Sequence, residues 1–120
     1  DAQGLYVLRK HRHLARAYGE APNAVAAARA HFETQLDRRV VGRLSARRYL
    51  VTDEFTAADL LLTSTLLWAR SEGWLPDAPA LREYVERNAA RPACEALQQM
   101  KRDLPSGIAP VEIAPDGSVT

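Results

Sequence analysis

Cationic side chains are concentrated in one short stretch near the start of the chain. The sequence RKHRHLAR contains Arg9, Lys10, His11, Arg12, His13 and Arg16. Cations gathered on one side of a helix can attract carboxylates or stabilise a nearby anion such as a thiolate. The same pattern also fits a solvated helix face or a face that meets a second subunit, so these interpretations remain open.

Nucleic acid and metal ions are not the partners that this sequence favours. The 120 residues carry a net charge of +1, which implies no general attraction to nucleic acid or to acidic lipid. A basic patch that binds nucleic acid would also be expected to carry stacking aromatic side chains, and we identify none. His11, His13 and His31 do not lie at a metal-ligand spacing with carboxylates, so we expect no metal site.

The single cysteine, Cys94, follows Arg91-Pro92 near the start of a predicted helix. A thiol at a helix N-terminus can have a lowered pKa and be reactive. We favour the alternative that Cys94 is a small buried group. One cysteine excludes an internal disulfide and fits a reducing compartment, and we identify no signal peptide or membrane-spanning run, so we expect a cytoplasmic protein.

The residues from Phe55 to Arg70, FTAADLLLTSTLLWAR, predict the helix around which the rest of the chain folds. Thr56 is expected to be the N-cap, and Asp59, three residues later, can accept a hydrogen bond from the Thr56 N–H to complete a capping box. The stretch that follows is apolar on nearly every side, which is typical of a buried helix. We therefore assign Thr56 and Asp59 a structural role.

Four further helices follow from apolar spacing and from the positions of Gly and Pro. They are expected at about residues 5–18, 24–43, 80–88 and 92–102, with Asn23 capping the second and Tyr49-Leu50-Val51 extended in the connector between 44 and 54. The predicted fold class is all-α, with about five helices packed around one central buried helix. We predict a helical domain over residues 1–103 and an irregular tail over 104–120.

Three blocks of this sequence resemble the C-terminal helical domain of glutathione S-transferases. They are Tyr49-Leu50-Val51 with Asp53-Glu54-Phe55-Thr56-Ala57-Ala58-Asp59-Leu60, then Pro79-Ala80-Leu81-Arg82-Glu83-Tyr84, then Ala90-Arg91-Pro92-Ala93. The blocks occur in the order and at the spacing of that family. The first block is the most specific, because its capping box is the family's folding signature.

The resemblance implies that two domains of the full protein have different roles. The glutathione site and the catalytic Ser, Tyr or Cys of the family lie mainly in a thioredoxin-like N-terminal domain, which nothing in this chain resembles. The chain begins DAQGLY without an initiator Met, and we interpret it as the C-terminal part of a larger glutathione transferase. We expect no catalytic residue in this chain and no activity from it alone.

By the same resemblance, the first helix lines the cleft that receives a small apolar electrophile and sometimes contacts glutathione. The residues expected to bind substrate are Tyr6, Arg9, Lys10 and His13. Core packing is the default expectation for Trp68 and Trp74, and the alternative is that one of them, Trp68, lines the electrophile pocket. The parent protein is expected to conjugate glutathione or exchange thiols, and to be a homodimer built partly through the first two helices.

Two other functions are compatible with a helical domain of this kind. One is a non-catalytic interaction module, as found in relatives attached to translation factors or synthetases. The other is the ligand-binding domain of a transcription regulator, which the three sequence blocks argue against. The sequence does not specify the electrophile, the class within the family or the oligomeric state of this part of the protein.

Overall fold

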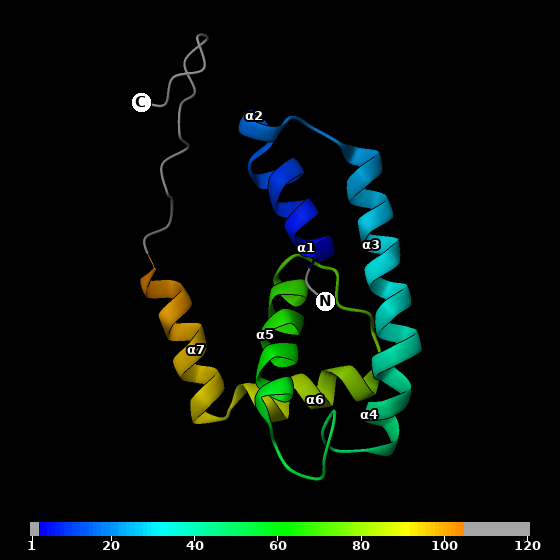
Figure 1. Ribbon diagram of the computed structural model, residues 1–120, viewed down its shortest axis with the longest axis vertical. Coiled ribbons are helices and arrows are strands. Elements are labelled where there is room, and N and C mark those ends of the chain that lie inside the picture. The colour runs from blue at the N-terminus through cyan, green and yellow to red at the C-terminus, as the bar shows by residue number, and fades with distance from the viewer. Residues whose placement is uncertain (1–2, 105–120) are drawn as a thin grey trace.

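The computed structural model describes residues 3–104, and every regular element in that range is helical. The elements are α1 (Gln3–Leu8), η1 (Arg9–His13), α2 (Ala15–Tyr18), α3 (Pro22–Leu36), η2 (Asp37–Val41), α4 (Gly42–Ala46), α5 (Ala57–Ser71), α6 (Pro79–Ala89) and α7 (Pro92–Asp103). The first three join into one helical stretch and the next three into another. Five helical stretches result, which confirms the predicted all-α class (Figure 1).

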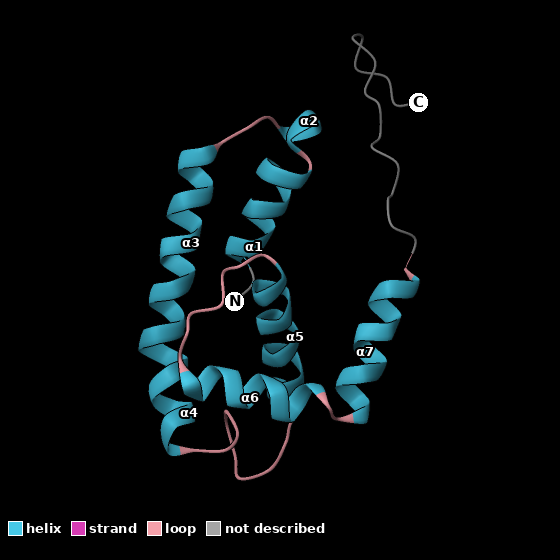
Figure 2. Ribbon diagram, turned by 180° about the vertical axis from the view of Figure 1, so that it is seen from behind, coloured by secondary structure: helices cyan, strands magenta, loops and turns pink. Residues whose placement is uncertain are grey.

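Helix α5 lies in the middle of the molecule, with α1 above it, α3 alongside and α7 rising on the other side (Figure 1). Figure 2 shows α6 crossing the lower end of α5 before the chain turns into α7. Helices α1 and α3 pack closely because Gly4 lacks a side chain. A Cβ atom at Gly4 would lie 3.1 Å from the carbonyl oxygen of Ala28, which is tighter than most contacts of this kind.

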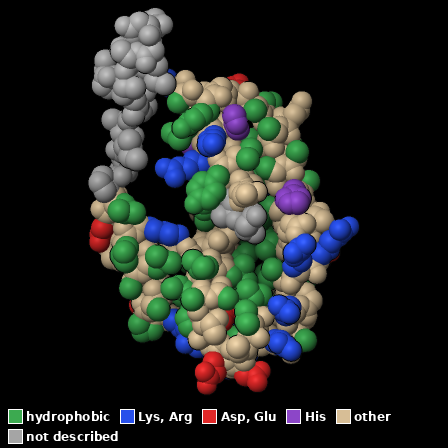
Figure 3. Space-filling model, viewed as in Figure 1, with side chains coloured by type: hydrophobic (Ala, Val, Ile, Leu, Met, Phe, Trp, Pro, Cys, Tyr) green, Lys and Arg blue, Asp and Glu red, His purple; other side chains and the backbone are tan. Residues whose placement is uncertain are grey.

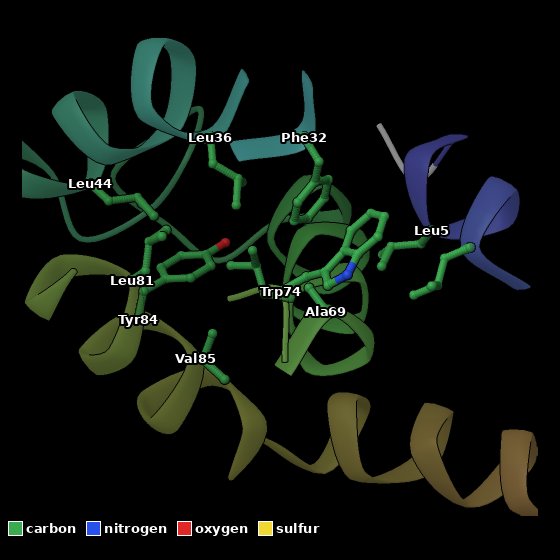
Figure 4. Packing of buried hydrophobic residues seen from close by; sticks show 11 residues of the cluster. Leu5, Phe32, Leu36, Leu44, Ala69, Trp74, Leu81, Tyr84 and Val85 are labelled. Atoms are coloured by element: carbon green, nitrogen blue, oxygen red, sulfur yellow. The ribbon is translucent and has the colours of Figure 1, made fainter. Parts of the chain in front are cut away.

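The hydrophobic core draws side chains from α1, α3, α4, α5 and α6 and from the segment that follows α5 (Figure 4). Its buried members are Leu5, Leu8, Phe32, Leu36, Leu44, Leu66, Ala69, Trp74, Leu81, Tyr84 and Val85. The indole of Trp74 lies with its ring centre 6.0 Å from that of Phe32, and only 2 % of Trp74 is exposed. Trp74 is therefore a core residue, which confirms the expectation of core packing.

The first two predicted helices differ in detail from the observed ones. The expected helix 5–18 is not a regular α-helix, because residues 9–13 form a π-helix and Leu14 has φ −112° and ψ 28°. Asn23 is not the N-cap that we predicted. Pro22 occupies the first helical turn and Ala21 is the cap residue, since the fixed φ of proline is suited to a helix start. The second stretch also continues through α4 to Ala46 rather than ending near Arg43.

The connector before α5 was predicted to be extended at residues 49–51, and this is wrong, because residues 48–54 form a series of bends. Tyr49 is nevertheless buried, and its hydroxyl accepts a 2.6 Å hydrogen bond from Arg91. The Arg91 guanidinium also lies 4.2 Å from the centre of the Phe55 ring. These contacts hold the connector against the start of α7.

Helix α5 was expected to be buried on all sides, and this is also wrong for its outer face. Leu61 is 66 % exposed, whereas the polar residues Asp59, Thr63 and Ser64 are buried. No described residue covers the face that carries Leu61. The predicted tail 104–120 lies outside the described residues apart from Leu104, which follows the end of α7 and is exposed.

Candidate functional site

An aromatic pair joins the first helical stretch to α5. The rings of Tyr6 in α1 and Trp68 in α5 meet edge to face, with their centres 5.0 Å apart and their planes at 81°. Tyr6 remains 52 % exposed and Trp68 is half-buried. An edge-to-face pair of this kind is stable and leaves part of both ring surfaces available to an apolar ligand.

Two of the predicted cations lie one turn beyond Tyr6, in the π-helix η1. The ammonium of Lys10 lies 5.6 Å from the centre of the Tyr18 ring, a cation–π arrangement. Arg9 is exposed and forms no hydrogen bond or ion pair with any described residue. Its charge is therefore available to an anion. Short π-helical segments occur frequently at functional sites, and this one carries the basic cluster.

The last predicted residue, His13, is held by a partner that the sequence analysis missed. Its Nε2 atom lies 3.0 Å from both carboxylate oxygens of Glu72, the residue that follows α5. Glu72 is the C-cap residue of α5 and lies four residues after Trp68, so the two are neighbours about one helical turn apart. The spacing of Trp68 and Glu72 is the one feature of the sequence that could have pointed to Glu72. It does so only after the structure has shown that Trp68 contacts the first helical stretch.

Tyr6 and His13 thus meet Trp68 and Glu72 across one continuous seam, which we call the α1–α5 seam. Its contacting residues are Tyr6, His13, Trp68 and Glu72, and Arg9 and Lys10 lie between Tyr6 and His13 in the chain. Figure 3 shows basic and histidine side chains beside exposed hydrophobic ones over α1, on the side of the molecule that faces α7. The structure therefore brings Tyr6, His13 and Trp68 to one surface, whereas Lys10 lies against Tyr18. The seam combines exposed aromatic surface, positive charge and a histidine.

The capping residues Thr56 and Asp59 lie inside the fold. The capping box is formed, with the Thr56 N–H 3.0 Å from Asp59 Oδ2. Asp59 Oδ1 also accepts hydrogen bonds from the Tyr84 hydroxyl at 2.7 Å and from the Leu50 N–H at 2.9 Å. Burial alone would raise the pKa of Asp59, but the hydrogen bonds from Tyr84, Leu50 and Thr56 outweigh it and lower the pKa.

Sequence reasoning missed Tyr84 as a partner of Asp59, because their contact joins α5 to α6 across 25 residues. Burial and the neighbouring carboxylate raise the pKa of Tyr84 well above its ordinary value, so the phenol stays neutral and donates. Burial likewise raises the pKa of Cys94, which outweighs the nearby Arg91 charge. The reactive-thiol interpretation of Cys94 is therefore wrong, and the buried interpretation is confirmed.

A groove lies between α5 and α7. This groove has a volume of about 850 Å³ and is lined by Leu67, Arg70, Ser71, Ala89, Pro92, Glu95, Ala96, Gln98, Gln99 and Arg102. None of the predicted substrate-binding residues lines it. This groove is therefore distinct from the surface that carries the aromatic pair.

Residues 3–104 contain no group of three or more His, Cys, Asp or Glu side chains arranged to hold a metal ion. Within the same range, none of the helices combines the length and hydropathy that a membrane crossing requires.

Residues 22–87 match the family described as glutathione S-transferase, C-terminal domain. The matched region includes the capping box, Trp68, Glu72 and Tyr84, whereas the first helical stretch lies before it. No curated protein and no solved structure matches the chain.

Proposed function

Because the chain belongs to the glutathione S-transferase C-terminal domain family, we propose that it provides the second-substrate wall of a glutathione transferase. The observation that carries this proposal is the Tyr6–Trp68 pair, which presents aromatic surface. Arg9 follows Tyr6 by three residues and has no partner among the described residues. A pocket for an apolar electrophile needs largely apolar walls with a few polar anchors. The α1–α5 seam supplies both kinds of group from two helices fixed in the core.

Each group of the seam has a distinct part in this proposal. The rings of Tyr6 and Trp68 contact the apolar body of the electrophile. Arg9 attracts a carboxylate of glutathione, because its guanidinium is not neutralised by any described residue. Lys10 adds positive potential from its position against Tyr18.

The chemistry in this proposal is attack by the glutathione thiolate on an electrophilic carbon, or exchange of that thiol with a disulfide. The residue that activates the thiol belongs to a thioredoxin-like domain outside residues 1–120, and this chain positions the second substrate. We further propose that the parent is a cytoplasmic homodimer, with the first two helical stretches contributing to the subunit contact.

The affinity of the chain for S-hexylglutathione, measured by titration calorimetry, tests the proposal. This ligand combines the two carboxylates of glutathione with an apolar chain. Removing one ring of the pair with Tyr6→Ala should weaken binding about 2- to 13-fold, the equivalent of roughly 0.5–1.5 kcal/mol. Arg9→Gln should weaken it by a smaller factor, about 1.4- to 5-fold, because the cation is exposed.

Two matched variants serve as controls. Leu61→Ala removes an exposed apolar side chain from the other end of α5, and Arg16→Gln removes an exposed cation from α2. Both should leave the affinity unchanged. Equal losses in Tyr6→Ala and Leu61→Ala would contradict the proposal and favour the non-catalytic interaction module.

A further inference from the structure

A second group of cationic side chains lies at the end of the second helical stretch, outside the α1–α5 seam. Residues 38–48 contain five arginines and no acidic residue, whereas the whole chain has a net charge of only +1. All five arginines are exposed. Figure 3 shows basic side chains along this side of the molecule, over the end of α3 and over α4. We call this surface the arginine edge, and it consists of Arg38, Arg39, Arg43, Arg47 and Arg48.

The packing of the core explains why these side chains point outward. Helices α3, η2 and α4 form one continuous helical stretch, in which Leu36 and Leu44 are buried and Val40 is half-buried. These apolar residues follow one another at intervals of four and hold one face of the stretch against the core. The arginines occupy positions between and after them, so their guanidinium groups extend into solvent.

The charges of the arginine edge are not neutralised by the rest of the fold. Arg38, Arg39 and Arg43 form no hydrogen bond or ion pair with any described residue. The side chains of the other two arginines contact the connector before α5, through the carbonyl oxygen of Val51 and the ring of Tyr49. The edge thus carries five positive charges with no carboxylate partner among the described residues.

The stability of the helix accounts for only part of this arrangement. Arg43 lies in the last turn of α4, where the helix dipole favours a cation. The dipole acts within the last turn, so it gives no reason for a cation at Arg38 or Arg39. Arg39 and Arg43 are four residues apart, and like charges at this spacing destabilise a helix. An anionic partner, by contrast, would be attracted by all of these charges.

Gly42 lies between Arg39 and Arg43 in the sequence and is also exposed. It has helical φ and ψ of −60° and −40°, and a Cβ atom at this position would meet nothing within 4 Å. Alanine would therefore fit here and would favour the helix, because glycine is less favourable in a helix interior. The missing side chain leaves the helix backbone open to the close approach of another chain.

We propose that the arginine edge is a docking surface for a short acidic segment of another protein, whose carboxylates pair with Arg38, Arg39 and Arg43. Each guanidinium can bind a carboxylate through two parallel N–H···O bonds. Side chains four residues apart on a helix are neighbours at about 5–6 Å, so a partner helix with acidic residues four apart presents carboxylates at a similar interval. The edge is separate from the α1–α5 seam, so this docking function is independent of the proposed glutathione site.

A protein segment fits this surface better than nucleic acid does. The edge is short, and the whole chain carries 15 Asp and Glu beside its 16 Lys and Arg. A long polyanion would extend beyond the edge and meet those acidic side chains, whereas a short acidic segment would not. Single-stranded nucleic acid would also need aromatic side chains to stack on. The exposed aromatic residues of the described range, Tyr6 and Tyr18, belong to the first helical stretch.

Fluorescence anisotropy with a labelled helical peptide tests the proposal on the 120-residue chain. The peptide has Glu at every fourth position and Ala between, and its neutral counterpart has Gln in place of Glu. Only the acidic peptide should bind, and its affinity should fall as NaCl is added, because salt screens exposed charges. The edge variant, Arg39→Gln with Arg43→Gln, should weaken binding about 2- to 25-fold, or about 1.4- to 5-fold for each exposed ion pair.

Arg12→Gln combined with Arg16→Gln is the matched control. These two arginines are also exposed and four residues apart, but they lie in the first helical stretch. The control variant has the same net charge as the edge variant and should bind the peptide as tightly as wild type. Circular dichroism should show that both variants keep the helical content of wild type, because none of the four side chains has a partner among the described residues.

Three results would overturn the inference. The first is the absence of binding of the acidic peptide at low salt. The second is an equal loss of affinity in the edge and control variants, which would show attraction by net charge alone. The third is a DNA duplex of similar length that binds more tightly than the peptide and loses this affinity in the edge variant, which would assign the surface to nucleic acid.

Discussion

Replacing Asp59 with Ala should destabilise the domain more than replacing any other described Asp or Glu with Ala. Asp59 is fully buried, with an exposed fraction of 0 %, and its two oxygens serve three separate parts of the chain. They accept from the Thr56 N–H at the start of α5, from the Leu50 N–H in the connector and from the Tyr84 hydroxyl in α6.

The size of the effect follows from these bonds. Loss of an N-terminal cap costs about 0.5–2 kcal/mol. Each buried donor left without an acceptor costs about 1–3 kcal/mol, and Asp59→Ala leaves two such donors on Leu50 and Tyr84. Removing the carboxylate also relieves its desolvation. A net loss of about 3–5 kcal/mol in the free energy of unfolding is therefore expected.

Thermal and urea unfolding followed by circular dichroism measure this loss. For a domain of this size 1 kcal/mol corresponds to roughly 4–8 °C in Tm, so Tm should fall by at least about 12 °C. Asp77→Ala is the matched control, because the Asp77 side chain is 92 % exposed and, among the described residues, pairs with Arg82 alone. Its effect should stay below about 1 kcal/mol. A Tm of Asp59→Ala within 2 °C of wild type, where ~2 °C is under about 0.5 kcal/mol, would refute the reasoning.

Three further predictions concern the buried groups. Hydrogen bonds lower the pKa of Asp59 in the folded state. The contribution of Asp59 to stability is therefore complete above its ordinary pKa of about 3.9 and is lost as the pH falls through the folded value. Urea midpoints measured between about pH 5 and pH 2 should show this loss in wild type but not in Asp59→Asn. Cys94 should react with a thiol reagent such as dithionitrobenzoate only in urea-unfolded protein, since burial shields it and raises its pKa; rapid reaction of the folded chain would contradict its placement. Trp74→Ala should lower the free energy of unfolding in urea by about 3–5 kcal/mol. Trp68→Ala should lower it by less than about 2 kcal/mol, because Trp68 is half-buried. Equal losses would contradict the different burial of the two indoles.

Local patterns in the sequence predicted the helices and the start of α5 well. The capping box at Thr56 and Asp59 is encoded within four residues, so it could be identified without knowledge of the fold. The all-α class and the burial of Cys94 also follow from local spacing and composition. The start at Pro22 was missed because Asn23 is itself a good cap, and two adjacent start signals compete there.

Contacts between distant segments could not be predicted from such patterns. Glu72 lies 59 residues from His13, and Tyr84 lies 25 residues from Asp59. Helical spacing shows which residues share a face, but it does not show which helix that face meets. The exposure of Leu61 is of the same kind, because apolar character on all sides predicts burial only when every side has a neighbour.

The α1–α5 seam is proposed as the surface that receives a ligand, and the two indole N–H signals test this most directly. Titration of the ¹⁵N-labelled chain with S-hexylglutathione should shift the indole signal of Trp68, which lies in the seam. The signal of Trp74, buried in the core, should not move. Movement of Trp74 together with Trp68, or no movement of Trp68 at saturating ligand, would contradict the account.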